Sequence, residues 1–438
     1  MLLSLEYFSQ PHAAYQKLSM LPGFVLLESS DKNMGRFDIL SAYPYDQIKL
    51  FADTRDKIKE LNRLSEILER TSYGLELPFQ GGAIGYISYD LGAELQGIKS
   101  VPQSNLHDMP LLDIGLYDWA IIVDHHLKKV TLFAANEHET TQSIIQEIIA
   151  LWGNTGNSIS HFVVKDDFFP LISKGNYEES FYAILNALIE GRSYQVNYTQ
   201  PFHAHYEGDA WGIYCTISQK NPVPFSAFMR TPDADVLSFS PERFILYDQG
   251  ELLTSPIKGT MKRSANTLED EFLKSELLHC DKNRAENVMI VDLSRNDFGK
   301  IAKAGTVRVP RLCVVQSFNG VHHLVSDVEA VCKDSLSPLM AFLSCFPGGS
   351  ITGAPKLESM RIIQEQEPYS RGIYCGSIGY FSRHGRFDTN IAIRTVTAKN
   401  GVLHLAAGGG IVIDSVCSDE YQECYTKIAA IINGLKTI

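Results

Sequence analysis

Two short segments carry residues that could act as a nucleophile and as a general acid. Lys258 stands between an apolar residue and a glycine in Ser255-Pro-Ile-Lys-Gly-Thr260. A lysine in a partly dry pocket loses its proton more easily and becomes a nucleophile, although a surface turn would also accept it. Glu242 follows Pro241 beside an apolar segment, where desolvation would favour the protonated carboxyl. Lys258 is therefore a candidate nucleophile and Glu242 a candidate general acid.

Two predicted helices each carry oxygen-bearing side chains on one face. Asn283 and Glu286 are one helical step apart, and Glu420, Glu423 and Lys427 share a face further along the chain. Mg²⁺ prefers such oxygen ligands and keeps several of its waters, so these side chains could bind it together. The alternative is that acids in a first helical turn only stabilise the helix dipole.

Three further motifs resemble known sites but depart from them. The segment Gly348–Lys356 lacks the Lys-Ser/Thr pair that ends a P-loop. Gly408-Gly-Gly410 does not match the dinucleotide signature, although it lets a backbone approach a ligand closely. His322-His323 has no metal-site spacing, so we expect stacking or hydrogen bonding there.

The composition limits the partners of the chain. Its 438 residues carry a net charge of −12, which argues against nucleic acid or an anionic membrane as the main partner. No apolar run is long enough to span a membrane, and Met1–Glu6 lacks the basic region of a secretory signal. The eight cysteines form no C-x-x-C pair, so we expect free thiols in a cytoplasmic protein.

The elements that must position these residues are strands and helices without a regular repeat. Apolar segments between turn residues predict strands over 24–27, 37–40, 81–90, 120–123, 130–134, 236–240, 373–382, 388–397 and 402–407. Helical spacing of apolar residues predicts helices over 142–151, 268–280, 282–295, 356–367 and 419–433. A capping box at Asn176–Glu179 predicts one more, which ends at Gly191, and Pro355 fits a first helical turn. This irregular mixture favours an α+β fold.

The chain divides at a segment rich in turn-forming residues, Trp152–Ser158. This predicts an N-terminal region, 1–150, and a larger region, 160–438. Gly82-Ala-Ile-Gly-Tyr-Ile-Ser88 resembles Gly376-Ser-Ile-Gly-Tyr-Phe-Ser382. Two similar β-rich halves that form one compact unit would explain this similarity, and chance convergence of two glycine-bearing strands is the alternative.

A series of motifs in this order resembles the chorismate-utilising enzymes. The motifs are Ser240–Phe244, Pro256–Thr260, Arg284–Glu286, Val291–Asp297, His322–Ser326, Phe346–Lys356, Ile393–Arg394 and Ala407–Ile411. The resemblance is dense from about 170 to 438 and looser from 20 to 130. It implies chorismate as substrate and one large α+β unit, in which sheets from both halves stack between outer helices.

Two positions distinguish the members of that family. The resemblance associates Lys at position 258 with synthesis of 4-amino-4-deoxychorismate, for p-aminobenzoate and folate, and Ala with anthranilate synthesis. Gln195 stands where water-adding members carry a lysine base, and glutamine cannot deprotonate water. Both positions favour amination at C4 in this chain. The alternatives are anthranilate synthesis and a catalytically silent regulatory subunit, which would not need Lys258, Glu242, Glu286 and Glu423 intact.

The resemblance also implies roles for the site residues. Lys258 would attack the ring, and Glu242 would protonate the departing C4 hydroxyl. Glu286 and Glu423 would bind Mg²⁺ directly, while Glu420 and Asn283 would reach it through water; relatives often carry an acid in place of Asn283. Substrate contacts are expected from Gln195, Gly259, Thr260, His323, Thr352, Tyr374, Arg394, Gly408, Gly409, Gly410 and Lys427.

A partner and a second pocket follow from the same resemblance. The chain has no Gly-x-Cys-x-Gly nucleophile for glutamine hydrolysis. This implies a separate glutamine amidotransferase subunit that supplies ammonia. Leu27-Glu28-Ser29 and Asn221-Pro-Val-Pro-Phe225 resemble the tryptophan pocket of anthranilate synthase. An indole pocket is therefore expected, lined by Leu27, Glu28, Ser29, Pro224 and Phe225.

Overall fold

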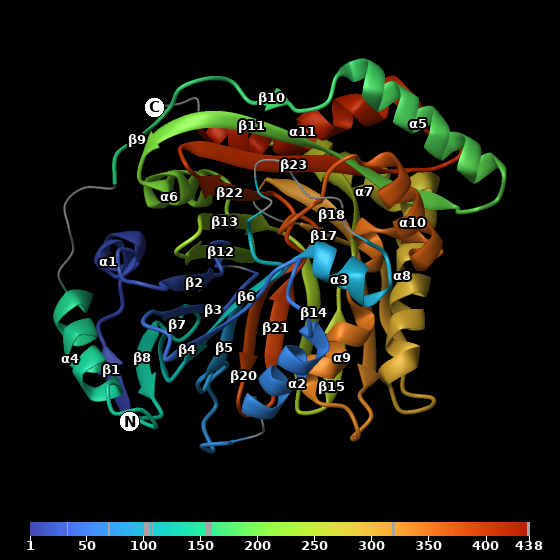
Figure 1. Cartoon of the computed structure of the whole chain (residues 1–438). Coiled ribbons are helices and arrows are strands. Elements are labelled where there is room, and N and C mark those ends of the chain that lie inside the picture. The colour runs from blue at the N-terminus through green and yellow to red at the C-terminus, as the bar shows by residue number, and fades with distance from the viewer. Residues whose placement is uncertain are drawn as a thin grey trace.

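The computed structural model describes residues 1–32, 34–68, 71–99, 106, 108–153, 160–317 and 320–435. Within these ranges the chain forms two large antiparallel sheets with helices on their outer faces (Figure 1). This architecture confirms the predicted α+β class. None of the helices in the described ranges has the length and apolar character that a bilayer-spanning segment requires.

The first sheet has thirteen strands in the described part of the chain. In spatial order these are β1 (Leu2–Leu5), β8 (Lys129–Ala134), β7 (Trp119–Asp124), β3 (Phe37–Ser41), β2 (Val25–Glu28), β12 (Phe225–Arg230), β13 (Asp235–Ser240), β22 (Thr395–Lys399), β23 (Val402–Ile411), β11 (Gln195–Gly208) and β10 (Phe169–Pro170). Two short strands, β9 (Phe162–Val164) and β19 (Gly353–Ala354), also pair with β11. The β2–β12 pairing joins the two regions of the chain within this sheet.

The second sheet has ten strands in the same ranges. Their order is β16 (Ile257–Lys262), β18 (Val321–Val331), β15 (Glu251–Thr254), β14 (Arg243–Asp248), β21 (Phe387–Asn390), β20 (Ser377–Ser382), β5 (Gly82–Ile87), β6 (Leu112–Tyr117) and β4 (Asp46–Leu50), with β17 (Arg308–Ser317) on β18. The two similar glycine-bearing segments are direct neighbours here, since β5 pairs with β20 from Gly82↔Ser382 to Ile87↔Ser377.

The apolar residues separate into layers that explain the arrangement. One cluster fills the space between the sheets, with Val25 and Met229 from the first and Ile84 and Tyr380 from the second. A second lies between the first sheet and the helices α1 (His12–Leu18), α4 (Thr141–Trp152), α5 (Lys174–Ile189), α6 (Ala210–Lys220) and α11 (Cys417–Leu435). A third lies between the second sheet and α2 (Lys57–Ile67), α3 (Tyr89–Leu95), α8 (Asp281–Ile301) and α9 (Pro338–Cys345). Helix α10 (Lys356–Gln366) contributes to both outer cores.

Several predicted boundaries were wrong for identifiable reasons. The helix expected to start at a capping box at Asn176 is α5, which begins at Lys174, because the Ser173 side chain caps it by accepting from the Asn176 N–H. Pro355 precedes α10 as its N-cap instead of occupying the first turn. The expected strand 373–382 starts only at Ser377. Residues 154–158 of the predicted linker lie outside the described residues.

The single strand expected over 388–397 is two strands in different sheets. Strand β21 belongs to the second sheet and β22 to the first, and Ile391–Arg394 connects them. Arg394 adopts a φ of +51°, a left-handed backbone that L-residues seldom adopt. Its carbonyl accepts from the Phe239 N–H at 3.1 Å, which holds the connection against β13. Arg394 is thus the last residue of the connection before β22 of the first sheet.

A buried ion pair ties α10 to the first sheet. Glu367 directly follows α10, and its carboxylate accepts from the Arg371 Nε and Nη2 at 2.9 and 2.8 Å and from the Thr199 N–H at 2.9 Å. Arg371 also donates to the Ile351 and Asn197 carbonyls at 2.8 and 2.6 Å. Every member has a partner, which a charge pair removed from water requires.

Replacing Glu367 with Ala should therefore destabilise the whole fold. It leaves the Arg371 guanidinium buried and unpaired, so the free energy of unfolding should fall by about 3–5 kcal/mol. Glu365→Ala is the matched control, because Glu365 lies on the same helix in an exposed pair with Arg192, worth about 1 kcal/mol or less. Urea unfolding monitored by circular dichroism measures both. Equal, small losses in the two variants would contradict the importance of the buried pair.

Candidate active site

Lys258 lies where strand β16 departs from regular pairing. Lys258 is opposite Leu324 and Thr260 is opposite His323, so the register shifts across Gly259. Gly259 has a φ of +75°, and a Cβ there would lie 2.9 Å from the Asn283 Cγ. Only glycine therefore allows α8 to approach this close to the lysine.

The Lys258 amine is partly shielded from solvent and lies among charged side chains. Its pKa is lowered, first by burial and then by the neighbouring Lys427 charge. The carboxylates of Glu286, Glu242 and Glu423 act on it in the opposite direction. The structure thus brings side chains from β16, α8, α11 and the β13–β14 turn around one amine.

Glu242 is buried in the turn between β13 and β14. The turn is fixed by its backbone, since the Ser240 hydroxyl donates to the Ile391 carbonyl at 2.6 Å and the Ile391 N–H donates to the Glu242 carbonyl at 3.0 Å. Burial raises the pKa of Glu242 to about 7, although the Lys258 charge opposes this. A carboxyl with such a pKa can give up a proton near neutrality. Ser350, which no motif had marked as a site residue, faces the same carboxyl.

Two acids of α11 face the glycine-rich end of β23. A Cβ at Gly409 would lie 2.8 Å from the Glu420 Oε2 and 3.4 Å from the Glu423 Oε1, so the glycine makes room for both carboxylates. Lys427 pairs with Glu423 at 2.6 Å and donates to the Gly408 carbonyl at 2.7 Å.

The pKa values of the two acids shift in opposite directions. Burial raises the pKa of Glu420, whose Oε1 accepts from the Ser415 hydroxyl at 2.7 Å. Burial acts in the same direction on Glu423, but the charge and hydrogen bond of Lys427, together with the charges of Lys258 and Lys282, outweigh burial and lower the pKa of Glu423. Lys282 on α8 also acts on both carboxylates and was missed, although its i, i+4 spacing to Glu286 could have drawn attention to it.

These residues fit a hard cation in the type of donor they offer. Glu286, Glu420 and Glu423 supply carboxylate oxygens, and the buried Oε2 of Glu420 has no hydrogen-bond partner. Oxygen donors of this kind are what Mg²⁺ selects. In the described ranges no three His, Cys, Asp or Glu side chains are close enough to form a complete metal cluster by themselves. The protein alone therefore does not provide a full ligand set.

Arg394 has the environment of an anion receptor. Burial lowers its pKa, and in the described part of the chain its guanidinium forms no ion pair. The nearby His323 is neutral, because burial, followed by the Arg394 charge, lowers its pKa to about 4. His323 Nδ1 lies 2.8 Å from the Thr260 hydroxyl. A buried guanidinium that lacks a protein anion can accept a ligand carboxylate.

The remaining predicted substrate residues differ in availability. Gln195 is 1% exposed, packs against Gly410, and has no hydrogen-bond partner for either side-chain polar atom. The Thr352 hydroxyl already donates to the Gly348 carbonyl at 2.9 Å. Tyr374 lies near Arg371 and Cys424, and within the described ranges it makes no hydrogen bond to Arg394. Joint binding of one carboxylate by Tyr374 and Arg394 stays a prediction.

The residues expected to form an indole pocket line one cavity of about 580 Å³. Leu27, Glu28, Ser29, Pro224 and Phe225 all border it, together with side chains of the second sheet such as Tyr380. The Glu28 carboxylate is already engaged outside the cavity, by His12 at 2.7 Å, the Tyr214 hydroxyl at 2.5 Å and the Ser218 hydroxyl at 2.9 Å. Lys258 does not line this cavity, so the cavity is separate from the Lys258 site. The Glu28 carboxylate at its border already has three hydrogen-bond partners.

Comparisons with known proteins agree with this arrangement. The family model of the chorismate binding enzymes matches residues 23–433. The chain is 40% identical to aminodeoxychorismate synthase component 1 of Escherichia coli (strain K12), over 96% of this chain and 95% of that protein. It is 43% identical to the protein of that name in Klebsiella aerogenes, over 82% and 78% of the two chains.

A solved structure shows the same fold. It is anthranilate synthase component I from Streptococcus pneumoniae TIGR4, with a TM-score of 0.81, 29% identity, and coverage of 91% of this chain and 92% of that one. The predicted stacking of two sheets between outer helices is thereby confirmed. With a family model that spans nearly all of the chain, the conclusion is that this chain belongs to the chorismate binding enzyme family.

Proposed function

We propose that this chain is the chorismate-converting component of an aminodeoxychorismate synthase. It would turn chorismate and ammonia into 4-amino-4-deoxychorismate and water, a step towards p-aminobenzoate and folate. The observation that carries the proposal is the pairing of Lys258, whose pKa is lowered, with Glu242, whose pKa is raised to about 7. Relatives named for this activity support it at 40% identity over almost the whole chain.

The two side chains divide the substitution into two steps. Neutral Lys258 forms a bond from its Nζ to C2 of the ring, the double bond shifts, and the C4–O bond breaks. Glu242 gives its proton to the departing hydroxyl, which leaves as water. Ammonia then bonds to C4, the C2–N bond breaks, and Lys258 is regenerated. The proton that ammonia loses returns to the Glu242 carboxylate, so the enzyme ends as it began.

Chorismate has two carboxylates, so an acidic chain must compensate them locally. Arg394 would bind the enolpyruvyl carboxylate with its planar fork, with Tyr374 beside it. The Gly408–Gly410 backbone, Thr352 and Lys427 would face the ring carboxylate, and His323, Thr260, Gly259 and Gln195 would line the ring. These contacts hold C2 near Lys258 and exclude water from the ring.

Mg²⁺ would be held by Glu286 and Glu423 directly and by Glu420 and Asn283 through water. Bound there, it would neutralise the ring carboxylate of chorismate. The support is the oxygen donor set on α8 and α11 and the unpartnered Glu420 oxygen. Asn283 replaces an acid, but its amide oxygen can still accept from a metal-bound water.

A second subunit would supply the ammonia. Relatives of this chain are named component 1, which implies another component. The chain has no Gly-x-Cys-x-Gly motif for glutamine hydrolysis, so we assign that role to a glutamine amidotransferase.

Anthranilate synthesis is the second candidate, because the similar solved structure carries that name. The 580 Å³ cavity would take an indole such as tryptophan in either case. Lys258 favours the C4 product, since its amine occupies the space from which ammonia would approach C2.

Replacing Lys258 tests this assignment of the nucleophile. Lys258→Arg keeps a charge without a usable amine, so aminodeoxychorismate formation should fall on the order of 10³-fold. Lys258→Ala should lose the C4 product equally and can form a trace of C2-aminated product. Chromatography of products from chorismate, Mg²⁺ and ammonium measures both. Wild-type rates of the C4 product in Lys258→Ala would overturn the proposal.

The pH dependence tests Glu242 as the acid. The protonated carboxyl is the active form, so the rate at constant free NH₃ should fall as the pH rises through about 7. Glu242→Gln should lower the rate about 10²–10⁴-fold and remove that descending limb. A limb that persists unchanged in Glu242→Gln would show that another group titrates.

Chelation and substitution test the metal site. Excess chelator should abolish the reaction, and Glu423→Gln should raise the half-saturating Mg²⁺ concentration by about tenfold or more, since a ligand charge is lost. Asp419→Asn is the control, because Asp419 is an exposed acid on the same helix. Full activity in excess chelator would refute the assignment.

A further inference from the structure

Helix α7 (Thr267–His279) is attached to the second sheet by only a small apolar core. Leu277 packs there against Cys313 and Leu324, with partly buried neighbours around them. Among the described residues, no α7 side chain belongs to the large core that holds α8 and α9. The position of α7 on the sheet therefore depends more than theirs on polar contacts.

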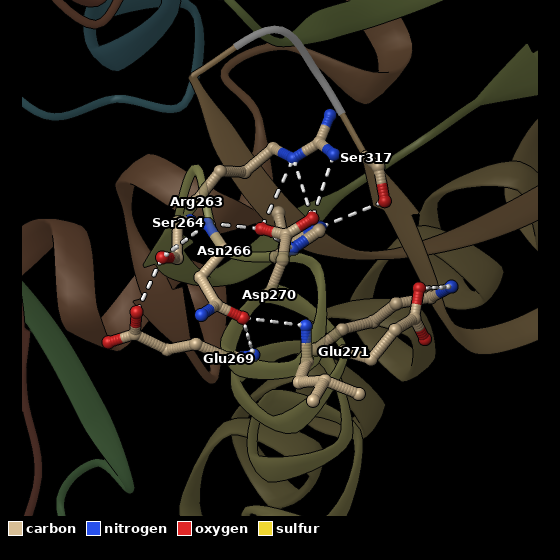
Figure 2. Close-up of polar contacts among 10 residues, drawn as sticks. Arg263, Ser264, Asn266, Glu269, Asp270, Glu271 and Ser317 are labelled. Atoms are coloured by element: carbon tan, nitrogen blue, oxygen red, sulfur yellow. Dashed lines mark hydrogen bonds and ion pairs between the residues drawn. The ribbon is translucent and has the colours of Figure 1, made fainter.

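Those polar contacts converge on one carboxylate in the first turns of α7 (Figure 2). Asp270 accepts from the Arg263 Nη2 and Nε at 2.7 and 3.1 Å, and from the Ser264 N–H at 3.0 Å. It also accepts from the His322 Nε2 at 3.1 Å. Arg263 hydrogen bonding holds the pKa of Asp270 at about 2, so the carboxylate stays charged. We call Asp270, Arg263 and His322 the α7 clamp.

The clamp joins three elements and does more than stabilise a helix end. Arg263 directly follows β16, and His322 lies on β18, where its Nδ1 is 2.8 Å from the Ser317 hydroxyl of β17. An ordinary first-turn acid serves the helix dipole from an exposed position. Asp270 is instead buried between the helix and the sheet, and its neighbour Asn266 already caps the helix by accepting from the Leu268 and Glu269 N–H groups.

The clamp lies directly behind the proposed active site. His322 is followed by His323, which faces the other side of β18 and contacts the Thr260 hydroxyl. Four residues before Arg263 is Gly259, where a Cβ would lie 3.0 Å from the Leu277 Cδ1 of α7 and 2.9 Å from the Asn283 Cγ of α8, so both helices approach the bulge closely. Cys280 is both the C-cap of α7 and the N-cap of α8, so one residue joins the two helices. Asn283 and Glu286 lie in the first turns of α8, directly after this shared cap residue.

We infer that Asp270 is a positioning residue, which through the α7 clamp holds the start of α8 and the β16 bulge in register for cation binding and for attack by Lys258. This inference rests on the proposed function. It identifies no new contact to substrate, since Asp270 faces away from the site.

The test compares Asp270→Asn with Arg263→Gln, which breaks the same clamp from the sheet side. Glu271→Gln is the matched control, because Glu271 is the next residue on α7 and forms an exposed ion pair with Lys274 at 3.5 Å. Each full-length variant is assayed with chorismate, Mg²⁺ and ammonium. Binding of Mn²⁺ alone, measured from the electron paramagnetic resonance signal of the free ion, is a second readout that needs no turnover.

Both clamp variants should bind Mn²⁺ about tenfold more weakly and need about tenfold more Mg²⁺ for half-saturation. Replacing a residue that supports the ligands of a metal site usually costs about this much affinity. At saturating Mg²⁺ kcat should recover more than kcat/KM, and circular dichroism should show a folded chain.

Unchanged Mn²⁺ and Mg²⁺ dependence in a folded clamp variant, or an equal change in Glu271→Gln, would overturn the inference. If Asp270→Asn does not fold, Arg263→Gln decides. A wild-type chain that forms no aminodeoxychorismate would instead refute the proposed function.

Discussion

The proposed chemistry depends on one lysine that is kept short of water and surrounded by balanced charge. Burial and Lys427 favour the neutral amine of Lys258, while Glu286, Glu242 and Glu423 favour the ammonium. A further carboxylate or cation beside these side chains would change the proportion of Lys258 that is neutral. Substrate and Mg²⁺ would each do so, which links binding to the reactivity of the amine. Glu242 in turn remains a usable acid, because burial raises its pKa more than the Lys258 charge lowers it.

The two sheets are needed because no local segment could assemble these groups. Lys258 comes from the end strand of the second sheet, whereas Gly408–Gly410 belong to β23 of the first. Helices α8 and α11, which are far apart in the sequence, carry the acids. Glycines at the closest approaches, Gly259 and Gly409, allow side chains to pack where a Cβ would collide. The crossing segment Ile391–Arg394 then brings a guanidinium to the same region.

The sequence predicted the α+β class from its irregular mixture of strand and helix patterns, and the activity from a series of ordered motifs that resemble one enzyme family. Lys258, Glu242, Glu286 and Glu423 stand in compact motifs, and most helices show clear apolar stripes. What was missed depends on long-range pairing or on competition between similar local choices. Ser173 and Asn176 are both good helix caps, and only the structure shows which is used. The apolar alternation over 388–397 hides the change of sheet at Arg394, since a positive φ leaves no mark on that pattern.

The central claim is that Lys258 bonds covalently to the ring. The most direct measurement is mass spectrometry of peptides from the full chain after incubation with chorismate and Mg²⁺ in the absence of ammonia, followed by rapid acid quench. The mechanism predicts that the peptide with Lys258 gains the mass of chorismate minus one water, and that Lys258→Ala shows no adduct. An unmodified Lys258 peptide under conditions where added ammonia gives rapid aminodeoxychorismate formation would contradict the account.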